Sequence, residues 1–324
     1  MKRRIAGHEV SAIGLGCLSF GGFYGGTNEA ESLACLETAL ELGVTHFDVA
    51  EVYGAGRCEE ILGTFLRGLD APVHIATKAG IYTEPDRHFR NDADSLRRSL
   101  EGSLKRLGRD RVDLFYLHRR EAARPLAEVI ETLVSFIEEG LIGGYGLSEV
   151  APTTIRDAHA IHPVAAVQSE YSLWTRLPEL GVLQACRDLG IAFVAFSPLG
   201  RGIFADRLPD PATFHAMDFR RGNPRFEEPH FSRNRAAIAP FRDYCRSRGW
   251  SVSAAAIAWT LDRGDHVLPI PGTRSAAHLR ELWSATTIRF TKEDRAEIAR
   301  LLPPGFAHGP RYSEAQAAGA EVYC

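Results

Sequence analysis

The chain has 324 residues, is 45% hydrophobic and 24% charged, and carries a formal net charge of −3. This composition is typical of a globular protein and excludes disordered, collagen-like and low-complexity chains. The slight negative charge offers no basic patch for a nucleic acid. No apolar run is long enough to span a bilayer, and no apolar signal core follows the basic residues at positions 2–4.

The six cysteines show no pairing pattern, because none belongs to a Cys-x-x-Cys motif and they are scattered at positions 17, 35, 58, 186, 245 and 324. Six cysteines are too few for a disulfide scaffold in a chain of this length. Their number and spacing indicate a reducing compartment. We therefore expect a cytoplasmic protein that has neither a nucleic acid nor a membrane as its partner.

Apolar periodicity predicts short strands that alternate with longer helices. The first helix is expected over 28–42, because Asn28 and Glu31 resemble a capping box and Gly43 ends the apolar face. The other helices are expected over 59–69, 95–107, 125–139, 153–161, 178–189, 253–261 and 276–284. Strands are expected over 11–16, 45–49, 73–77, 112–117, 144–147, 165–168, 191–196 and 267–270.

This alternation is typical of a parallel sheet covered by helices. Eight strand–helix units predict the α/β class and a (β/α)8 TIM barrel with an N-terminal β-hairpin and a long loop after strand 7. The hairpin, over 5–10 with its turn at Gly7-His8, would plug the bottom of the barrel. The loop, over 200–234, is long enough to be a lid or binding loop. No linker marks a second domain, so residues 1–324 are expected to form one domain, with the tail after Leu302 on its surface.

Polar side chains follow three successive strands of the predicted barrel, where catalytic groups of such barrels lie. Asp48 and Tyr53 follow strand 2, Lys78 follows strand 3 and His118 follows strand 4. Tyr53 could give a proton to a carbonyl oxygen that is being reduced by hydride, although a phenol with a pKa near ~10 is a slow acid. The Lys78 ammonium would lower that pKa. Asp48 would hold Lys78, and His118 would orient the substrate oxygen.

Each of these residues alone also fits an ordinary structural role. Tyr53 could be a loop tyrosine, Asp48 a turn cap, Lys78 a surface residue at a strand end, and His118 a hydrogen-bonded loop histidine. The functional interpretation depends on all four occurring together at successive strand ends.

Several segments of the chain resemble the aldo-keto reductase superfamily. They are Phe47-Asp48-Val49-Ala50-Glu51-Val52-Tyr53-Gly54, Ala76-Thr77-Lys78, Asp113-Leu114-Phe115-Tyr116-Leu117-His118, Gly272-Thr273-Arg274 and Arg311-Tyr312. The chain is most similar to the bacterial, plant and fungal monomeric branch. The resemblance implies a barrel that binds NADP(H) without a Rossmann domain, and a catalytic tetrad of Tyr53, Lys78, Asp48 and His118.

The same resemblance implies a cofactor site at the ends of the later strands. Gly21 and Gly22, in Phe20-Gly21-Gly22, would pass close to the nicotinamide. Phe196 would stack on the ring, and Ser148 and Gln168 would bond its carboxamide. The residue after Ser148 is Glu149, where the family often has asparagine. Ser197, Leu199 and Gly200 would cradle the pyrophosphate.

The segment Gly272-Thr273-Arg274 opens a helix, and helix N-termini and arginine side chains both bind phosphate. The resemblance assigns it to the adenosine 2′-phosphate, which favours NADPH over NADH. His278 and Glu281 are further expected contacts. His278 stands where the family usually has arginine, and Leu282 where it usually has an asparagine that contacts adenine; Arg280 could compensate.

Two other patterns carry no comparable signal. Gly14-Leu15-Gly16 is not a dinucleotide fingerprint, because no third glycine follows in register and no helix opens there. The twelve histidines show no metal-ligand spacing, so no catalytic metal is expected. The wall of a substrate pocket could come from aromatic and basic side chains, namely Tyr24, Tyr82, Trp174, Phe219, Arg225 and Phe226, although Trp174 equally fits the core.

Three functions remain open at this point. The first is NADPH-dependent reduction of an aldehyde or ketone to an alcohol. The second is a Schiff-base aldolase that uses Lys78, which pairing with Asp48 would disfavour. The third is a non-catalytic NADP-binding regulatory protein. A small-molecule carbonyl is the expected partner, and no assembly segment stands out, so we expect a monomer or a weak homo-oligomer.

Overall fold

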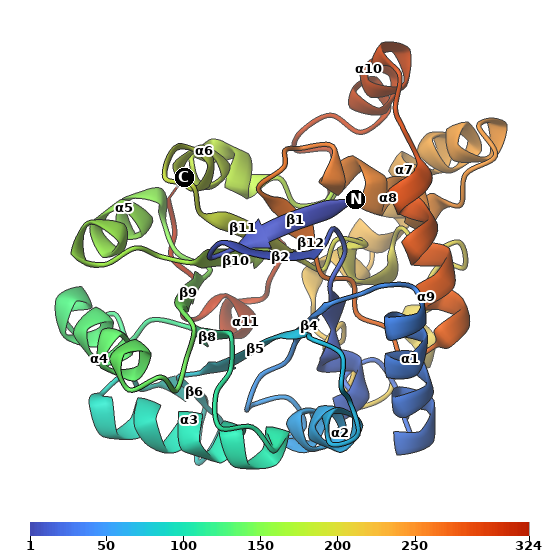
Figure 1. Cartoon of the computed structure of the whole chain (residues 1–324). Coiled ribbons are helices and arrows are strands. Elements are labelled where there is room, and N and C mark those ends of the chain that lie inside the picture. Colours follow the sequence, from blue (N-terminus) through green and yellow to red (C-terminus); the bar gives the residue numbers. More distant parts are fainter. Residues whose placement is uncertain (324) are drawn as a thin grey trace.

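Eight parallel strands form a curved sheet at the centre of the molecule (Figure 1). The structure is a computed structural model that describes residues 1–323, so Cys324 lies outside the described residues. The order of strands in the sheet follows the chain. They are β3 (Leu15–Gly16), β4 (His46–Asp48), β5 (His74–Ala79), β8 (Leu114–Leu117), β9 (Tyr145–Ser148), β10 (Ala166–Glu170), β11 (Ala192–Phe196) and β12 (Val267–Pro269).

The sheet closes between β3 and the segment after β12. Gly14 N–H donates to the Pro269 carbonyl (3.0 Å), and Gly16 N–H donates to that of Pro271 (3.1 Å). A Cβ on Gly14 would lie 2.7 Å from the His46 ring, and one on Gly16 would lie 2.9 Å from the Ile270 carbonyl oxygen. The two glycines are therefore needed for the close approach that completes the (β/α)8 barrel, as predicted.

The described residues form eleven α-helices, most of which cover the outside of the barrel. They are α1 (Glu29–Glu41), α2 (Arg57–Leu66), α3 (Ala93–Leu107), α4 (Leu126–Glu138), α5 (Pro152–Ile161), α6 (Val182–Asp188), α7 (His230–Ser247), α8 (Val252–Leu261), α9 (Ala276–Trp283), α10 (Lys292–Leu301) and α11 (Glu314–Ala317). The Asn28 side chain accepts from Glu31 N–H (2.8 Å), which is the half of the predicted capping box that the structure shows. No helix within residues 1–323 is both long and apolar enough to cross a bilayer.

Two predicted segments differ in the structure. The predicted loop over 200–234 was too long, because its end is the start of α7, an 18-residue helix with Pro240 inside it. The predicted helix over 178–189 is broken into a 3₁₀ turn (Leu177–Leu180) and α6. Gly181 separates them with φ = 135°, a conformation that a helix cannot contain.

Side chains alternate between the barrel interior and the layer under the helices. The interior is a small apolar cluster around Tyr116, with Ala76, Leu114, Ala166, Val194 and Leu268 from neighbouring strands. Tyr116 fills this space so closely that a Cβ on Gly146 would lie 2.4 Å from its ring. Residues two positions further along these strands also point inward, towards the mouth.

An N-terminal hairpin closes the bottom of the barrel, as predicted. Strands β1 (Lys2–Ile5) and β2 (His8–Ser11) pair antiparallel, with Ile5 opposite His8. The turn is therefore Ala6-Gly7, one residue earlier than predicted, and both turn residues have positive φ (48° and 83°). Such a two-residue turn suits the twist of a hairpin. Ile5 and Val10 join the interior cluster from below.

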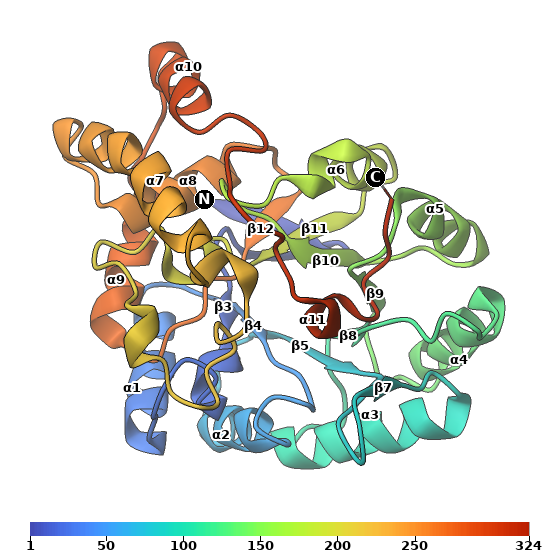
Figure 2. The same cartoon turned by 180° about the vertical axis from the view of Figure 1, so that it is seen from behind.

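The other end of the barrel is covered by the long connection after β11 and by the C-terminal tail (Figure 2). Phe219 N–H donates to the Phe23 carbonyl (3.1 Å), and Gln316 donates to the Phe219 carbonyl (3.0 Å). Glu321 in the tail accepts from Ala151 N–H and from the Thr154 hydroxyl, both at 2.7 Å. The connection and the tail are thus bound to one another and to the barrel.

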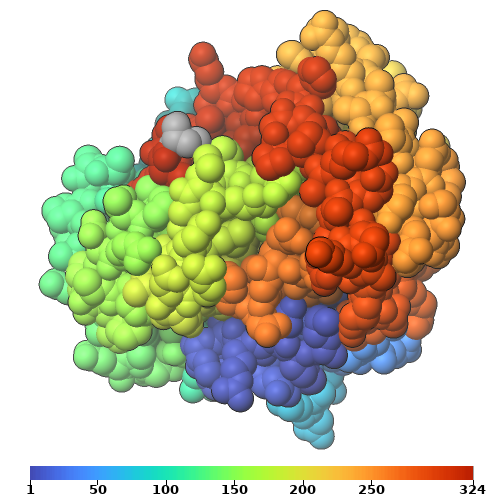
Figure 3. Space-filling model, turned by 90° about the horizontal axis from the view of Figure 1, so that it is seen from above, coloured from blue at the N-terminus to red at the C-terminus, as the bar shows by residue number. Residues whose placement is uncertain are grey.

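The helices beyond the eighth strand pack on this connection. Helix α10 lies beside α7 in the view from above (Figure 3). The Tyr244 hydroxyl of α7 donates to Asp294 of α10 (2.6 Å).

A short hairpin of β6 (Ile81–Tyr82) and β7 (His88–Phe89) follows β5 and was not predicted.

Two histidines meet inside the lower part of the barrel wall. His46 Nδ1 and His74 Nδ1 lie 3.0 Å apart, and both residues are buried. Burial holds the pKa of His46 well below its usual range. Burial, with a smaller contribution from His8, lowers the pKa of His74 to about 4, and Asp113 opposes this shift. Both rings are therefore neutral in the folded protein near pH 7.

We expect this pair to make the protein less stable in mild acid. The unfolded His74 binds a proton below pH ~6.5 and the folded one only near pH 4. The stabilisation is thus complete above about pH 6.5 and is lost as the pH falls towards 4. Between pH 7 and 5, urea unfolding of the wild type should lose at least about 2 kcal/mol more than that of a His46→Leu/His74→Leu variant, because His74 alone accounts for about that amount. Equal losses in the two proteins would contradict this expectation.

Candidate active site

The structure brings the four predicted catalytic residues together at the mouth of the barrel. Asp48 ends β4, Lys78 lies in β5 and His118 directly follows β8, where its N–H bonds to the Ala79 carbonyl (2.8 Å). Tyr53 lies in the loop before α2. Lys78 Nζ is 5.1 Å from the centre of the Tyr53 ring, and the rings of Tyr53 and His118 are 5.7 Å apart.

Asp48 and Lys78 form a buried ion pair at the centre of this group. Their side chains are 3% and 0% exposed. The ammonium also donates to the Val49 carbonyl (2.8 Å). Gln168 Nε2 donates to the second oxygen of Asp48 (2.8 Å). Burial raises the pKa of Asp48 and lowers that of Lys78, and the hydrogen bond between them opposes both shifts.

The pKa of Tyr53 differs from the predicted direction. Burial raises it well above 10, Asp48 raises it further, and the cation that lowers it is Arg119. The prediction that Lys78 gives Tyr53 a low pKa was wrong, because burial and the charge of Asp48 outweigh the nearby positive charge. Burial and the charges of Arg119, Lys78 and Arg87 hold the pKa of His118 well below its usual range. Both side chains are therefore uncharged near pH 7.

Close packing of glycines positions the Tyr53 loop. A Cβ on Gly21 would lie 3.0 Å from Cys58 Sγ and 3.1 Å from Gly54 N. Gly54 has φ = 61° and Gly22 has φ = 81°. The predicted Gly21-Gly22 segment is thus explained by its contact with the Tyr53-Gly54 loop, in addition to any contact with a ligand.

The residues expected to hold a carboxamide point towards the mouth but are already bonded within the chain. Ser148 Oγ accepts from Arg119 (3.0 Å), and Gln168 binds Asp48. Phe196 is half-buried and packs on the interior cluster. The three side chains therefore lie at successive strand ends, next to the four catalytic candidates.

The turn after β11 has an unusual backbone. Ser197 has φ = 49° and Gly200 has φ = 55°, and Gly200 N–H donates to the Ser197 carbonyl (2.9 Å). A Cβ on Gly200 would lie 2.8 Å from Ile203 and 2.9 Å from Trp174. A left-handed serine is uncommon, and such backbones are frequent at ligand sites. Leu199 completes this turn and is half-buried.

Polar groups suited to a phosphate lie in and beside the segment after β12. The Ser19 hydroxyl is buried without a hydrogen-bond partner and lies 4.0 Å from the position of a Cβ on Gly272. Arg274 is half-buried and donates to the Tyr24 carbonyl at 3.4 Å. Within residues 1–323 it has no carboxylate within 4.0 Å. Thr273 is buried and binds Ser275 N–H (3.1 Å), at the cap of α9.

The adenine side of the predicted site is less open. His278 is exposed, so it is available to a ligand. Glu281 accepts a short hydrogen bond from Ser253, which also donates to Asp206 (3.1 Å). Burial, with Asp206 nearby, raises the pKa of Glu281. Leu282 is 3% exposed and belongs to the core, which explains why an apolar residue stands there.

Sequence reasoning missed a buried ionic network behind the mouth. Glu170 binds Arg201 (2.9 Å) and lies 3.6 Å from Arg311. Glu149 pairs with Arg311 and accepts from Glu170 N–H (2.8 Å). The one available signal was the Glu149 position, where the family often has asparagine. The network ties the tail to β9 and β10.

Two of the six expected pocket-wall residues lie in the core. Trp174 and Phe226 are each 4% exposed and pack on one another at 5.5 Å. Tyr82 turns its hydroxyl to Ser99 on α3 (3.1 Å). Tyr24 and Phe219 remain beside the mouth, because Phe219 N–H binds the neighbouring Phe23 carbonyl.

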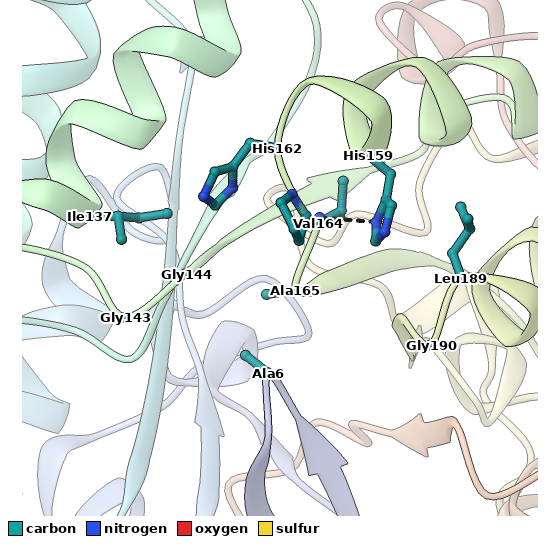
Figure 4. A pocket seen from close by; sticks show the side chains of 11 residues that line it. Ala6, Ile137, Gly143, Gly144, His159, His162, Val164, Ala165, Leu189 and Gly190 are labelled. Carbon is teal, nitrogen blue, oxygen red and sulfur yellow. Dashed lines mark hydrogen bonds between the residues drawn. The ribbon is translucent and has the colours of Figure 1, made fainter.

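A cavity of about 390 Å³ opens at the opposite end of the barrel, beside the hairpin turn at Ala6 (Figure 4). His159 and His162 line it together with apolar residues and glycines. His159 Nδ1 accepts from Val164 N–H (3.2 Å). None of the candidate catalytic residues lines this cavity.

Comparisons with known proteins agree with the family resemblance and with the barrel fold. A family model described as the aldo/keto reductase family matches residues 12–303. The NADP(+) aldo-keto reductase yakc of Schizosaccharomyces pombe is 34% identical over 99% of this chain and 96% of its own length. A glycerol dehydrogenase from Gluconobacter oxydans superposes with a TM-score of 0.85 at 27% identity, over 93% of this chain and 94% of that one. An aldo-keto reductase from Klebsiella pneumoniae in complex with NADPH superposes with a TM-score of 0.76 at 25% identity, over 97% and 99% of the two chains.

Removing one partner of the Asp48–Lys78 pair should destabilise the protein. We expect Lys78→Met to lower the free energy of unfolding by about 3 kcal/mol, because it leaves a buried carboxylate without its cation. The double variant Asp48→Leu/Lys78→Met removes both charges and should recover most of that loss. Urea unfolding at pH 7 measures both values. A double variant less stable than the single one would show that the pair itself is strongly stabilising.

Proposed function

The chain belongs to the aldo/keto reductase family, and we propose that it reduces a small aldehyde or ketone to an alcohol with NADPH. The observation that carries this proposal is the meeting of Tyr53, Lys78, Asp48 and His118 at one rim of the barrel. This group offers a neutral acid and a neutral hydrogen-bond donor, with a buried ion pair beneath them.

In the proposed mechanism, Tyr53 gives its proton to the carbonyl oxygen as the alcohol forms. Its raised pKa keeps the phenol protonated at neutral pH. His118 is uncharged and orients the same oxygen through a ring N–H. Lys78 is held by Asp48 next to the Tyr53 ring, where the ammonium stabilises the negative charge that develops on the phenol oxygen. Arg119 acts on Tyr53 in the same sense.

The residues at the ends of the later strands fit NADPH. When bound, NADPH supplies the hydride. We propose that Gly21, Gly22, Ser148, Gln168 and Phe196 surround its nicotinamide, and that the rest of the cradle follows along the rim: Ser197, Leu199, Gly200, Gly272, Thr273, Arg274, His278 and Glu281. The unpartnered Ser19 hydroxyl and the half-buried Arg274 support a phosphate at the start of α9. The name of the Schizosaccharomyces relative supports NADP(H) as well.

The other two functions have less support. A Schiff-base aldolase needs an accessible amine, whereas Lys78 is completely buried and bonded to Asp48 and the Val49 carbonyl. A regulatory NADP-binding protein would not need the Tyr53 and His118 arrangement at the mouth.

We also propose the setting in which the enzyme works. All five cysteines in the described part of the chain are free and buried, which supports a reducing, cytoplasmic environment. One apolar cluster includes residues from Ala12 to Leu302, which supports one barrel domain over residues 1–324. A monomer or weak homo-oligomer remains our proposal for its assembly.

Replacing Tyr53 by phenylalanine should remove turnover but not cofactor binding. We expect kcat for an activated aromatic aldehyde to fall by about a hundredfold or more, because the proton donor is lost in the transition state. The Kd for NADPH, measured by fluorescence, should stay nearly unchanged. Tyr244→Phe, in the distant α7, serves as the matched control. Normal turnover in Tyr53→Phe would overturn the mechanism.

Replacing Arg274 by alanine should weaken NADPH much more than NADH. Loss of a charged hydrogen bond to the 2′-phosphate should raise the Kd for NADPH about tenfold or more. The exposed Arg289 gives a matched control variant, Arg289→Ala. Equal losses for the two cofactors would mean that the phosphate binds elsewhere.

A further inference from the structure

The mouth of the barrel carries more arginine than carboxylate. Three carboxylates there are paired with three arginines: Glu170 with Arg201 and more distantly with Arg311, Glu149 with Arg311, and Asp218 with Arg220. Three further arginines have no carboxylate partner within residues 1–323: Arg87, Arg119 and Arg225. Arg225 instead binds the Trp174 and Gly309 carbonyls and the Thr175 hydroxyl. Arg87 and Arg119 therefore remain as arginines that could bind an anionic ligand.

Arg119 lies directly beside the reaction centre. It follows His118 in the chain, is 7% exposed, and donates through Nη1 to the His118 carbonyl (2.6 Å) and Ser148 Oγ (3.0 Å). Its Nε–H is buried and has no partner. Buried donors without partners are uncommon and call for a ligand or an ordered water. The guanidinium thus has a free donor close to Tyr53 and His118.

Arg87 lies in the β6–β7 hairpin and is exposed. Its Nη1 donates to the Ala315 carbonyl of α11 (2.7 Å), and its guanidinium lies 5.3 Å from the centre of the Phe89 ring. Burial and repulsion by Arg119 lower the pKa of Arg87, and the charges of both arginines contribute to the lowered pKa of His118. A negative group between them would relieve that repulsion.

We propose that Arg119 and Arg87 form an anion subsite beside Tyr53, and that the substrate is a carbonyl compound which carries a carboxylate or a phosphate. This inference rests on the proposed function, because it names the substrate class of the same site. A planar guanidinium binds either anion through two parallel N–H donors. The anionic end of the substrate would then hold its carbonyl next to Tyr53 and His118.

The test compares charged and neutral partners of the same carbonyl compound. One pair is 4-carboxybenzaldehyde and its methyl ester; the other is glyceraldehyde 3-phosphate and glyceraldehyde. We expect kcat/KM to be about tenfold or more higher for the anion in at least one pair. The pair with the larger ratio distinguishes carboxylate from phosphate. Arg87→Ala and Arg119→Met should each lower that ratio several-fold, mainly through KM, whereas Arg156→Ala, on the distant α5, should not change it.

Binding of the alcohol product 4-(hydroxymethyl)benzoate and of its methyl ester distinguishes failure of the anion subsite from failure of the proposed reduction. Calorimetric titration in the presence of NADPH, which cannot accept a hydride from the alcohol, should show tighter binding of the anion in the wild type and loss of that difference in Arg87→Ala. The same titration with glycerol 3-phosphate and glycerol covers the phosphate. Selective anion binding without turnover of any aldehyde would support the subsite and reject the proposed reduction. Ratios near one in both pairs and no anion preference in either titration, or a preference that both variants retain, would overturn the subsite.

Discussion

The barrel depends on one close backbone approach, where Gly14 and Gly16 bond to Pro269 and Pro271. No side chain fits at either glycine, because the His46 ring and the Ile270 carbonyl already occupy the space. Closure sets which residues of each strand face inward. Asp48, Lys78, Ser148 and Gln168 share the inward orientation with the apolar cluster below them. The alternation of inward and outward side chains along each strand therefore places apolar residues in the interior and these polar residues at the mouth.

Most buried charges near the mouth are paired, and the pairs join segments that are far apart in the sequence. Asp48 and Lys78 connect neighbouring strands, Glu170 binds Arg201 in the connection after β11, and Glu149 binds Arg311 in the tail. A charge removed from water needs a partner of opposite sign. The network thus fixes the position of the connection and the tail relative to the strand ends. At the mouth, Arg119 is buried but has no carboxylate partner among the described residues.

The repeating strands and helices, and the four residues at their ends, could be predicted from the sequence because they follow simple rules. Apolar periodicity marked each strand, and catalytic side chains lie at strand ends in closed barrels. Helix α7 could not be predicted, because it is rich in arginine and contains Pro240, which normally disfavours a helix interior. Its buried face has helical spacing at Phe231, Ile238 and Phe241, but Asn234 and Arg242 are buried beside them and interrupt the apolar pattern. Arg119 and Arg201 were missed for a different reason, since only tertiary contacts distinguish a buried arginine from an exposed one.

The attachment of the tail through Glu321 has a practical consequence. This carboxylate binds Ala151 N–H, Thr154 and Arg120, all on or near the far side of the mouth from α7. One wall of the mouth is therefore a peptide segment that crosses the barrel without belonging to any of its eight units. Proteolysis between Leu302 and Arg311 would leave every strand intact but remove the counter-ion of Glu149. A fusion partner joined beyond Glu321 would disturb the contacts of the same segment, so an affinity tag is better placed before β1, on the hairpin side of the barrel.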